Sequence, residues 1–287
     1  MPNLKMSVEV TVAIVNYKTP ELLENCLSSI FKHVRDVSFV VWVLDNASRD
    51  GSVELVRKKF PKVRLIANKQ NSMAALGFNT ILSQAKSPYC LITEPGVELM
   101  NNAVSPMIKF LKRHPKAAAV STRQVDEVGS FDTTCSRFPT PIIEVFNSSI
   151  FSRFVKNKKL LSWWRYRGWK RDSVRRVEVA SDIFMLAKTE VLTKVDYYDT
   201  NMDLFFIEND LCLKIRSAGY YVYHLGNVTV RHLRGRSTAK FKPSEMYKFY
   251  EHDMLYYYKK HFGFFWWLFL VLVFQSNRLY YFFARTK

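Results

Sequence analysis

The sequence has few glycines and cysteines for its length, and it lacks the motifs of several common protein classes. Nine of its 287 residues are glycine, and it contains neither GxGxxG nor GxxxxGK[ST], so a dinucleotide-binding fold and a P-loop are both unsupported. The cysteines are widely spaced and form no CxxC pair, which argues against zinc and favours reduced thiols in a cytoplasmic setting. They are Cys26, Cys90, Cys135 and Cys212.

Acidic residues are also scarce. The chain has 43 Lys and Arg against 25 Asp and Glu, for a net charge of +18 and a pI near 9.7. This imbalance implies a polyanionic partner: nucleic acid, an anionic membrane surface or a phosphorylated small molecule. The N-terminus shows no charged-then-apolar signal pattern, and Val8 to Val15 is better explained as a strand. A hydrophobic content of 48% excludes wholesale disorder.

The first third of the chain alternates between β-branched apolar runs and segments with helical spacing. Helices are predicted to begin at Pro20, after Asp50 and near Gly77. The order predicts an α/β fold with a mostly parallel, doubly wound sheet, whose ligand cleft lies at the carboxyl ends of the strands. The predicted strands are 8–16, 38–44, 63–66 and 89–92.

Polar residues follow each of these strands, at the edge where the cleft is expected. One aspartate after a strand is more often a turn residue or a cap, but four polar strand ends together favour a binding site. The residues are Asn16 and Tyr17 after the first strand, Asp45 after the second, Asn68 and Asn71 after the third, and Glu94 after the fourth.

A second polar group lies at 205–240. Glu208 and Asp210 begin a predicted short helix that Gly219 ends, and a predicted strand follows it to His232 and a cluster of arginines. Carboxylates, a histidine and arginines together suit a site that handles a proton and a phosphate. The alternative is a helix whose acids favour its dipole, followed by an exposed basic loop.

Several of these segments resemble one known family. IVNY at 14–17, LDNASRDGS at 44–52, FIENDLCLKIRSAGY and VRHLRGRS are similar to family 2 of the inverting nucleotide-sugar glycosyltransferases, and most similar to the rhamnosyltransferase-like branch of bacterial surface polysaccharide synthesis. The resemblance implies a GT-A type fold over 1–240, with a nucleotide-binding half (1–100) and an acceptor and catalytic half (101–240). We expect Asp45 and Glu208 to line one crevice around the donor sugar.

The resemblance also implies the catalytic base. The family usually reads Glu-Asp-x-Asp-Leu-Cys, and alignment on Asp210 places its catalytic aspartate at Glu208. We therefore expect Glu208 to accept the proton of the acceptor hydroxyl, with Asp210 as the alternative.

A donor site follows from the resemblance and the strand ends together. Met73 stands where a glycine is usual, and Asp182 stands in place of a frequent Gly-Ala, where it contacts the donor sugar or caps a turn. The candidate nucleotide-sugar-binding residues are Asn16, Tyr17, Asp45, Asn71, Asn79, Asp182, Arg234 and Arg236.

The metal site departs from the family pattern of Asn-Pro-Asp after the fourth strand. Gly96 stands where the metal-binding aspartate belongs, so Glu94 and His232 become the candidate ligands of a Mg²⁺ or Mn²⁺ ion. His232 could instead be a hydrogen-bonded core histidine. The nearby arginines could also neutralise part of the diphosphate charge without a cation.

Two further segments suggest a membrane surface. The insert 151–176 carries ten Lys or Arg, one Asp and three interleaved tryptophans, a mixture suited to lipid headgroups, to nucleic acid or to a solvated loop. The tail 241–287 combines an amphipathic segment with the uncharged run 262–274, too short to span a bilayer. We expect the tail to be a membrane-association helix, with a buried docking helix as the alternative.

Taken together, the sequence predicts an inverting glycosyltransferase at the cytoplasmic face of the membrane, peripheral or monotopic. It would move a sugar such as rhamnose from a nucleoside-diphosphate donor to a glycan or lipid-linked acceptor. A catalytically degenerate relative is one alternative, because Gly96 and Asp182 depart from the family. A basic nucleic-acid-binding protein is another, but it leaves the strand-end residues without a role, so no nucleic acid is expected.

Overall fold

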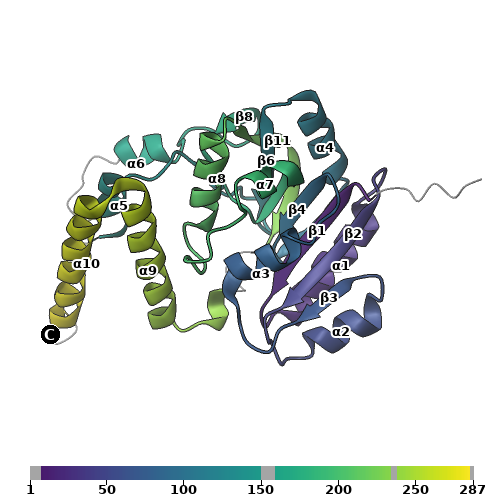
Figure 1. Ribbon diagram of the computed structural model, residues 1–287, viewed down its shortest axis with the longest axis horizontal. Coiled ribbons are helices and arrows are strands. Elements are labelled where there is room, and N and C mark those ends of the chain that lie inside the picture. The colour runs from purple at the N-terminus through teal and green to yellow at the C-terminus, as the bar shows by residue number, and fades with distance from the viewer. Residues whose placement is uncertain (1–7, 150–158, 234–237, 285–287) are drawn as a thin grey trace, which may run out of the picture.

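The computed structural model describes residues 8–149, 159–233 and 238–284 (Figure 1). Its first third alternates strands and helices as predicted, and β1 pairs in parallel with both β2 and β4, so that Asn16 lies opposite Asp45. The elements are β1 (Val10–Asn16), α1 (Pro20–His33), β2 (Phe39–Asp45), α2 (Ser52–Lys59), β3 (Arg64–Ala67), α3 (Met73–Leu82) and β4 (Tyr89–Thr93).

The second part of the chain extends the same sheet. β10 is antiparallel to β4 and β6, whereas β6 and β11 are parallel, so the sheet is mixed, with its parallel part where the sequence predicts it. The α/β fold class is therefore confirmed. The elements are β5 (Val97–Glu98), α4 (Val104–Arg113), β6 (Ala117–Val125), β7 (Cys135–Ser136), α5 (Pro141–Ser148), α6 (Lys159–Trp164), β8 (Val174–Val177), β9 (Val179–Ala180), β10 (Phe184–Lys188), α7 (Thr189–Lys194), α8 (Ile207–Ser217) and β11 (Tyr221–His232).

The order of strands across the described sheet is β3-β2-β1-β4-β10-β6-β11-β5, with β8 pairing on β11. Helices cover both faces. The apolar sides of α1, α2 and α4 pack on one face, and those of α3 and α8 pack on the other (Figure 1). This arrangement places the ends of β1, β2 and β4 and the start of α8 along one edge of the sheet.

Helix α1 shows how local sequence sets an element. Pro20 occupies its first turn, and five buried residues recur at helical spacing along the side that packs on the sheet. Thr19 occupies the N-cap position, but its side chain makes no capping hydrogen bond, and its hydroxyl donates to Oδ1 of Asn16 at 2.7 Å. The cap residue therefore orients a strand-end side chain.

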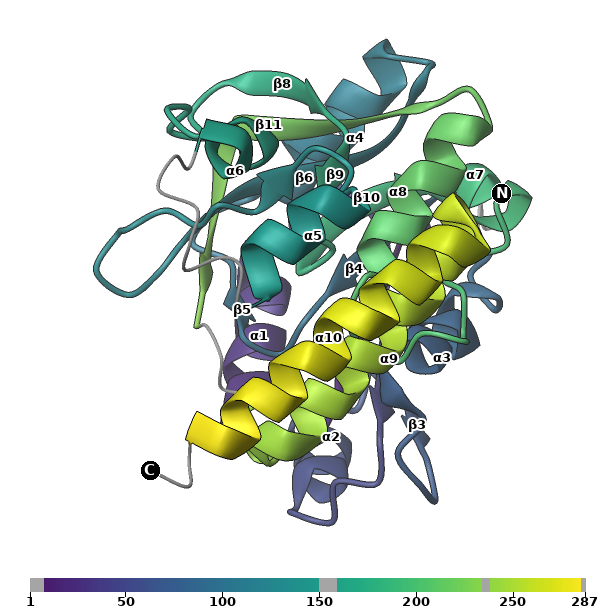
Figure 2. The same cartoon turned by 90° about the vertical axis from the view of Figure 1, so that its left-hand side faces the viewer.

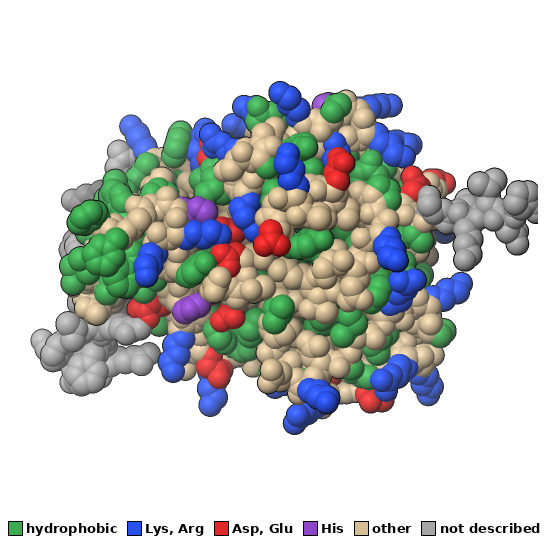
Figure 3. Space-filling model, viewed as in Figure 1, with side chains coloured by type: hydrophobic (Ala, Val, Ile, Leu, Met, Phe, Trp, Pro, Cys, Tyr) green, Lys and Arg blue, Asp and Glu red, His purple; other side chains and the backbone are tan. Residues whose placement is uncertain are grey.

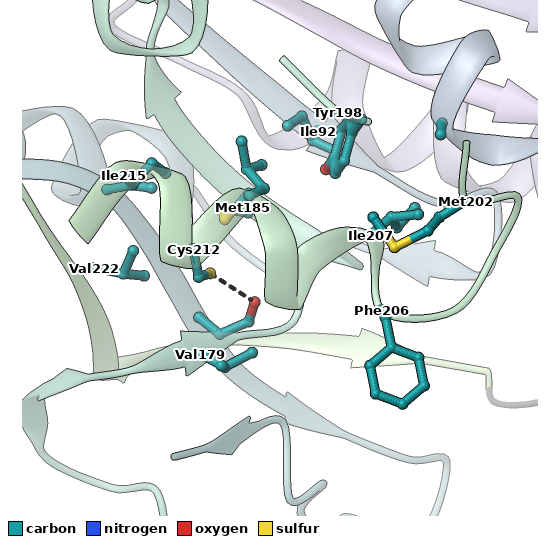
Figure 4. Packing of buried hydrophobic residues seen from close by; sticks show 14 of the residues in the cluster. Ile92, Val179, Met185, Tyr198, Met202, Phe206, Ile207, Cys212, Ile215 and Val222 are labelled. Atoms are coloured by element: carbon teal, nitrogen blue, oxygen red, sulfur yellow. Dashed lines mark hydrogen bonds between the residues drawn. The ribbon is translucent and has the colours of Figure 1, made fainter. Parts of the chain in front are cut away.

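Helix α8 is held by its apolar side. Ile215 packs near Val222, and the thiol of Cys212 donates to the carbonyl of Ala180 at 3.9 Å (Figure 4). This packing fixes the helix that carries Glu208 and Asp210.

The C-terminal segment is helical, as expected. The short 3₁₀ turn η2 (Thr238–Lys240) leads into α9 (Pro243–Phe262), and α10 (Phe264–Ala284) runs back beside α9 after Gly263 (Figure 2). Met254, Tyr257 and Tyr258 of α9 are fully buried, so α9 is part of the hydrophobic core. Across the described residues, no helix has both the length and the apolar character needed to cross a bilayer.

Candidate active site

The ends of β1 and β2 carry a buried network of hydrogen bonds. The side-chain amide of Asn16 donates to Oδ2 of Asp45 at 2.8 Å. Ser48 donates to both carboxylate oxygens of Asp45, from its backbone N–H at 2.9 Å and from its hydroxyl at 2.6 Å. Asp45 is only 1% exposed. Its carboxylate therefore orders the two loops that form this edge of the sheet.

Two cavities adjoin this network. Asp45 lines a cavity of about 710 Å³ together with Asn68 and Lys69 from the end of β3. Tyr17 and Asn71 line a smaller one of about 110 Å³, which also includes Glu94. Three of the predicted strand ends thus meet at the small cavity, as the parallel topology requires.

The backbone around the small cavity is unusual at one position. Met73 has φ +61°, a left-handed conformation that costs a side-chain-bearing residue about 1 kcal/mol and glycine almost nothing. This conformation gives a physical reason for the glycine usual at this place in the resembled family. Asn71 stabilises the turn, because its Oδ1 accepts the backbone N–H of Met73 at 2.8 Å.

A third cavity, of about 500 Å³, is formed by residues of the second half of the chain. Glu208, Asn209 and His232 line it, together with Glu144 and Tyr250. Its position suits the acceptor side of a transfer site.

Three carboxylates of this region have raised pKa values. Burial, followed by the nearby charges of Asp182 and Glu94, raises the pKa of Glu208 to about 8. Burial also raises the pKa of Asp182, and burial together with the charge of Asp182 raises that of Glu94. A carboxylate with a pKa near neutrality is suited to take up a proton during a reaction.

Asp182 is held by a chain of contacts that the sequence does not reveal. Tyr198 donates its hydroxyl to Oδ2 of Asp182 at 2.8 Å. Asn79 in turn fixes the backbone of Tyr198, by donating to its carbonyl at 2.8 Å and accepting its N–H at 3.0 Å. Both polar atoms of the Asn79 side chain are thus used, so its contribution to the site is to position Tyr198 and, through it, Asp182.

The two candidate metal ligands lie close together. Nε2 of His232 is 3.9 Å from Oε2 of Glu94, and Nδ1 of the same ring is 3.6 Å from Oδ2 of Asp132. Donor atoms about 2.1 Å from one cation lie roughly 3 to 4 Å apart, so the Glu94–His232 spacing fits a shared ion. A β-carbon on Gly96 would lie 3.7 Å from Nε2 of His232, which places the family's usual ligand position beside this ring.

Another group of potential ligands has a structural role. Among the described residues, Asp203, His252 and Asp253 bring three ligand atoms within 4.8 Å of one another. The carboxylate of Asp253 is already occupied by the backbone N–H groups of residues 203, 204 and 205. It secures the loop that precedes α8.

Asp210 points away from the 500 Å³ cavity. It is fully buried and contacts Nζ of Lys260 at 2.6 Å, Nε2 of His261 at 2.7 Å and Nζ of Lys214 at 3.6 Å. Burial would raise its pKa, but hydrogen bonds from His261 and Lys260 bring the pKa below its ordinary value. Asp210 joins α8 to α9, whereas Glu208, two residues earlier, faces the cavity.

The single crevice expected around Asp45 and Glu208 is divided. The two side chains line different cavities, because the Asp45 carboxylate is turned into the hydrogen bonds of its own loops. Neither residue lines the small cavity of Tyr17 and Glu94, although the charge of Glu94 acts on Glu208. Arg234 and Arg236 lie outside the described residues.

Comparisons with known proteins identify the family and the fold. The family model for glycosyl transferase family 2 matches residues 11–178. N-acetylglucosaminyl-diphospho-decaprenol L-rhamnosyltransferase of Mycobacterium tuberculosis is 22% identical over 247 residues, covering 82% of this chain and 79% of the relative.

Two solved structures share the fold. A mannosyltransferase from Pyrobaculum calidifontis in complex with GDP-Man and Mn²⁺ superposes with a TM-score of 0.57 at 18% identity, over 88% of this chain and 63% of that one. GalNAc-T7 with UDP, GalNAc and Mn²⁺ gives a TM-score of 0.57 at 14% identity, over 78% of this chain and 44% of that one. The fold is therefore of the GT-A type, and the chain belongs to glycosyl transferase family 2 and is a rhamnosyltransferase-like glycosyltransferase.

Proposed function

We propose that the protein transfers a deoxyhexose such as rhamnose, with inversion, from a nucleoside-diphosphate donor to a lipid-linked glycan, and that Glu208 is its base. The observation that carries this proposal is the raised pKa of Glu208 at the border of the 500 Å³ cavity. The Mycobacterium tuberculosis relative is named for a rhamnosyl transfer to a lipid-linked diphosphate sugar, and both structural neighbours hold nucleotide or nucleotide sugar with Mn²⁺.

The geometry supports one displacement step. The carboxylate of Glu208 takes the proton of an acceptor hydroxyl, and the hydroxyl oxygen forms a bond to the anomeric carbon of the donor sugar. The bond from that carbon to the nucleoside diphosphate breaks on the opposite face, which inverts the configuration. We assign the nucleotide to the cavity that Tyr17 and Asn71 line. Asp182, which Tyr198 holds by a hydrogen bond, is the candidate contact of the donor sugar.

Glu94 and His232 would hold a Mg²⁺ or Mn²⁺ ion, which supplies positive charge to the departing diphosphate when it is bound. The 3.9 Å spacing of their donor atoms supports this assignment.

A panel of UDP-, dTDP- and GDP-sugars tests the function directly. We expect one nucleoside class to raise the melting temperature, and the same sugar nucleotide to be hydrolysed or transferred. Stabilisation without turnover would favour the degenerate relative. Salt-sensitive retention on DNA with no nucleotide effect would favour a nucleic-acid-binding protein.

Gly96→Asp is expected to strengthen metal binding. The new carboxylate would project toward the His232 ring and add a charged ligand, so Mn²⁺ affinity should rise by about tenfold. Gly96→Ala is the matched control, because it introduces the same β-carbon 3.2 Å from the carbonyl oxygen of Leu233 without the carboxylate. Calorimetric titration of Mn²⁺ measures both. Equal affinity in the two variants would place the ion elsewhere.

The pH dependence of transfer should follow Glu208. Because the base must be ionised, kcat/KM is expected to rise with pH and to level off above about 8. Stability should move the other way, because a raised folded-state pKa contributes stability that is fully present below the ordinary 4.5 and is lost as the pH rises through about 8. Rate profiles and denaturation at several pH values test both signs. A rate profile that is flat from pH 6 to 9 would remove Glu208 as the titrating base.

We also propose that the protein lies on the cytoplasmic face of the membrane through α10. One side of α10 packs on α9 and α5, and the opposite side leaves large apolar side chains exposed (Figure 3). The insert 151–176 adds groups suited to the lipid headgroup layer, namely its Lys and Arg residues and Trp163, which is 54% exposed. In the part of α10 whose burial is described, 264–276, the exposed large apolar residues are Phe264, Phe265, Trp266, Leu268, Phe269 and Leu272.

Phe265→Glu should weaken binding to anionic vesicles severalfold without destabilising the fold, because this side chain is 84% exposed. Val128→Glu is the control. Val128 is as exposed as Phe265, at 85%, and receives the same charge, but it lies in a loop far from α10 in the sequence. Point variants are preferable to removal of 241–287, which would strip α9 from the core. Equal vesicle flotation of both variants would contradict the anchor.

A further inference from the structure

A cavity unrelated to the proposed transfer step lies between β8 and the C-terminal end of α8. It has a volume of about 470 Å³, within the range of small-molecule sites. Four arginines line it against one carboxylate, that of Glu178. The arginines are Arg137, Arg175, Arg176 and Arg216, and three tyrosines, Tyr166, Tyr220 and Tyr221, complete the polar lining.

Each of these arginines holds its guanidinium carbon over an aromatic ring, at the distance of a cation–π contact. Such a contact limits side-chain motion, so less entropy is lost when a ligand binds. The pairs are Arg137 over Trp163 at 4.4 Å, Arg175 over Tyr166 at 4.6 Å, Arg176 over Tyr221 at 4.6 Å and Arg216 over Phe138 at 5.4 Å, measured from the guanidinium carbon to the ring centroid.

The charge of this cluster is poorly compensated from within the protein. Nη1 of Arg137 lies 3.3 Å from Glu178, but its buried Nε has no hydrogen-bond partner. Within the described parts of the chain, no carboxylate lies within ion-pair distance of Arg175, Arg176 or Arg216. Four cations gathered around one polar cavity repel one another unless an anion joins them.

We propose that this cavity binds a phosphoryl group, as a phosphate ester or diphosphate, at a second site separate from the donor site. The planar N–H fork of arginine matches the oxygens of phosphate, and several such forks around one cavity give charge-assisted hydrogen bonds from different directions. The source is a soluble phosphate compound or the headgroup of an anionic lipid, which share this chemistry.

The site is separate from the transfer site but adjoins it. Glu178, which lies between β8 and β9, lines the arginine cavity, whereas its neighbour Val179 in β9 lines the cavity of Glu208. Cys212 lines the arginine cavity one helical turn after Glu208. The two cavities therefore adjoin at the start of β9 and along α8 without sharing a lining residue.

Calorimetric titration of the full chain with inorganic pyrophosphate tests the proposal. A chelator is present throughout, so that cation-dependent binding at the donor site is silent. We expect binding by the native protein, and a loss of about tenfold or more in affinity for Arg175→Ala combined with Arg176→Ala. Both residues are exposed on β8, and Arg216→Ala on α8 provides an independent variant if the pair fails to fold.

The matched control combines Arg57→Ala and Arg113→Ala, two exposed arginines of α2 and α4 that remove the same charge elsewhere. Equal loss in the control, or unchanged affinity in the cavity variants, would overturn the site. The part of nucleoside-diphosphate binding that requires Mn²⁺ should be unchanged in every variant, which separates this site from the proposed function.

Vesicles identify the source of the phosphoryl group. The competitors are vesicles of phosphatidylcholine alone and vesicles that also contain phosphatidylglycerol. If only the vesicles with phosphatidylglycerol displace pyrophosphate, the site binds a lipid headgroup. Pyrophosphate binding that both vesicles leave intact assigns it to a soluble phosphate compound.

Discussion

Glu208→Gln is expected to lower kcat for sugar transfer by about 10²- to 10⁴-fold, the usual contribution of a general base. Glutamine keeps the size of the side chain and its contact with Asn209, but it cannot accept the proton of the acceptor hydroxyl. KM for the donor should change little, because the nucleotide is assigned to the cavity of Tyr17 and Asn71. Steady-state transfer kinetics with a saturating acceptor measure the effect.

Two further variants make this result specific. Glu208→Asp keeps a carboxylate, as the resembled family does, and should retain part of the activity with a shifted pH profile. Glu190→Gln removes the same charge from an exposed position of α7 and should behave as the native protein. Wild-type transfer by Glu208→Gln, together with complete loss in Asp210→Asn, would reverse the assignment of the base.

The first half of the fold was accessible to sequence reasoning because it depends on local patterns. Runs of β-branched residues and helical spacing predict β1 to β4 and α1 to α3, and parallel topology alone brings Tyr17, Asn71 and Glu94 to one edge. Periodicity and chain order suffice for such residues. Glu208 was predicted instead from the resemblance to a family motif at a helix start, and its role as the base remains a proposal.

Other parts of the site depend on contacts between distant segments. The side chain of Asn79 hydrogen-bonds the backbone of Tyr198, 119 residues later. These contacts favour a role in positioning Tyr198 over the predicted contact with the nucleotide sugar. Asp132 lies beside His232 in a loop with no periodic signal. The orientation of Asp45 into its own loops was equally hidden, because strand-end position does not reveal where a carboxylate points.

The helical tail shows the same limit. Its composition predicted association with a surface, and α10 does expose aromatic residues. Yet α9 supplies buried tyrosines, and its Lys260 and His261 contact Asp210. The sequence of residues 207–217 gives no indication of these contacts. The two acids of this motif therefore have different surroundings. Glu208 faces a cavity, whereas Asp210 faces the lysine and histidine of α9.

Asp210→Asn should consequently damage stability more than chemistry. Removing the carboxylate leaves Lys260, Lys214 and His261 without their buried partner, and a broken buried ion pair costs about 3 to 5 kcal/mol. Because both lysines are partly exposed, about 2 to 4 kcal/mol is the better expectation, or a fall of roughly 5 to 15 °C in Tm. Chemical and thermal denaturation measure it.

The pH dependence of that stability provides an independent check. Asp210 has a lowered pKa, so its contribution is present at neutral pH and is lost as the pH falls through its folded-state value; the Asn variant should therefore differ least from the native protein in acid. Glu24→Gln is the control, because it removes a solvent-exposed pair with Lys59 and should change the free energy of unfolding by less than about 1 kcal/mol. Native stability combined with lost transfer in Asp210→Asn would instead place this carboxylate in the chemistry. The expected outcome, a weakened but still active enzyme, follows from Asp210 facing α9 while Glu208 faces the cavity.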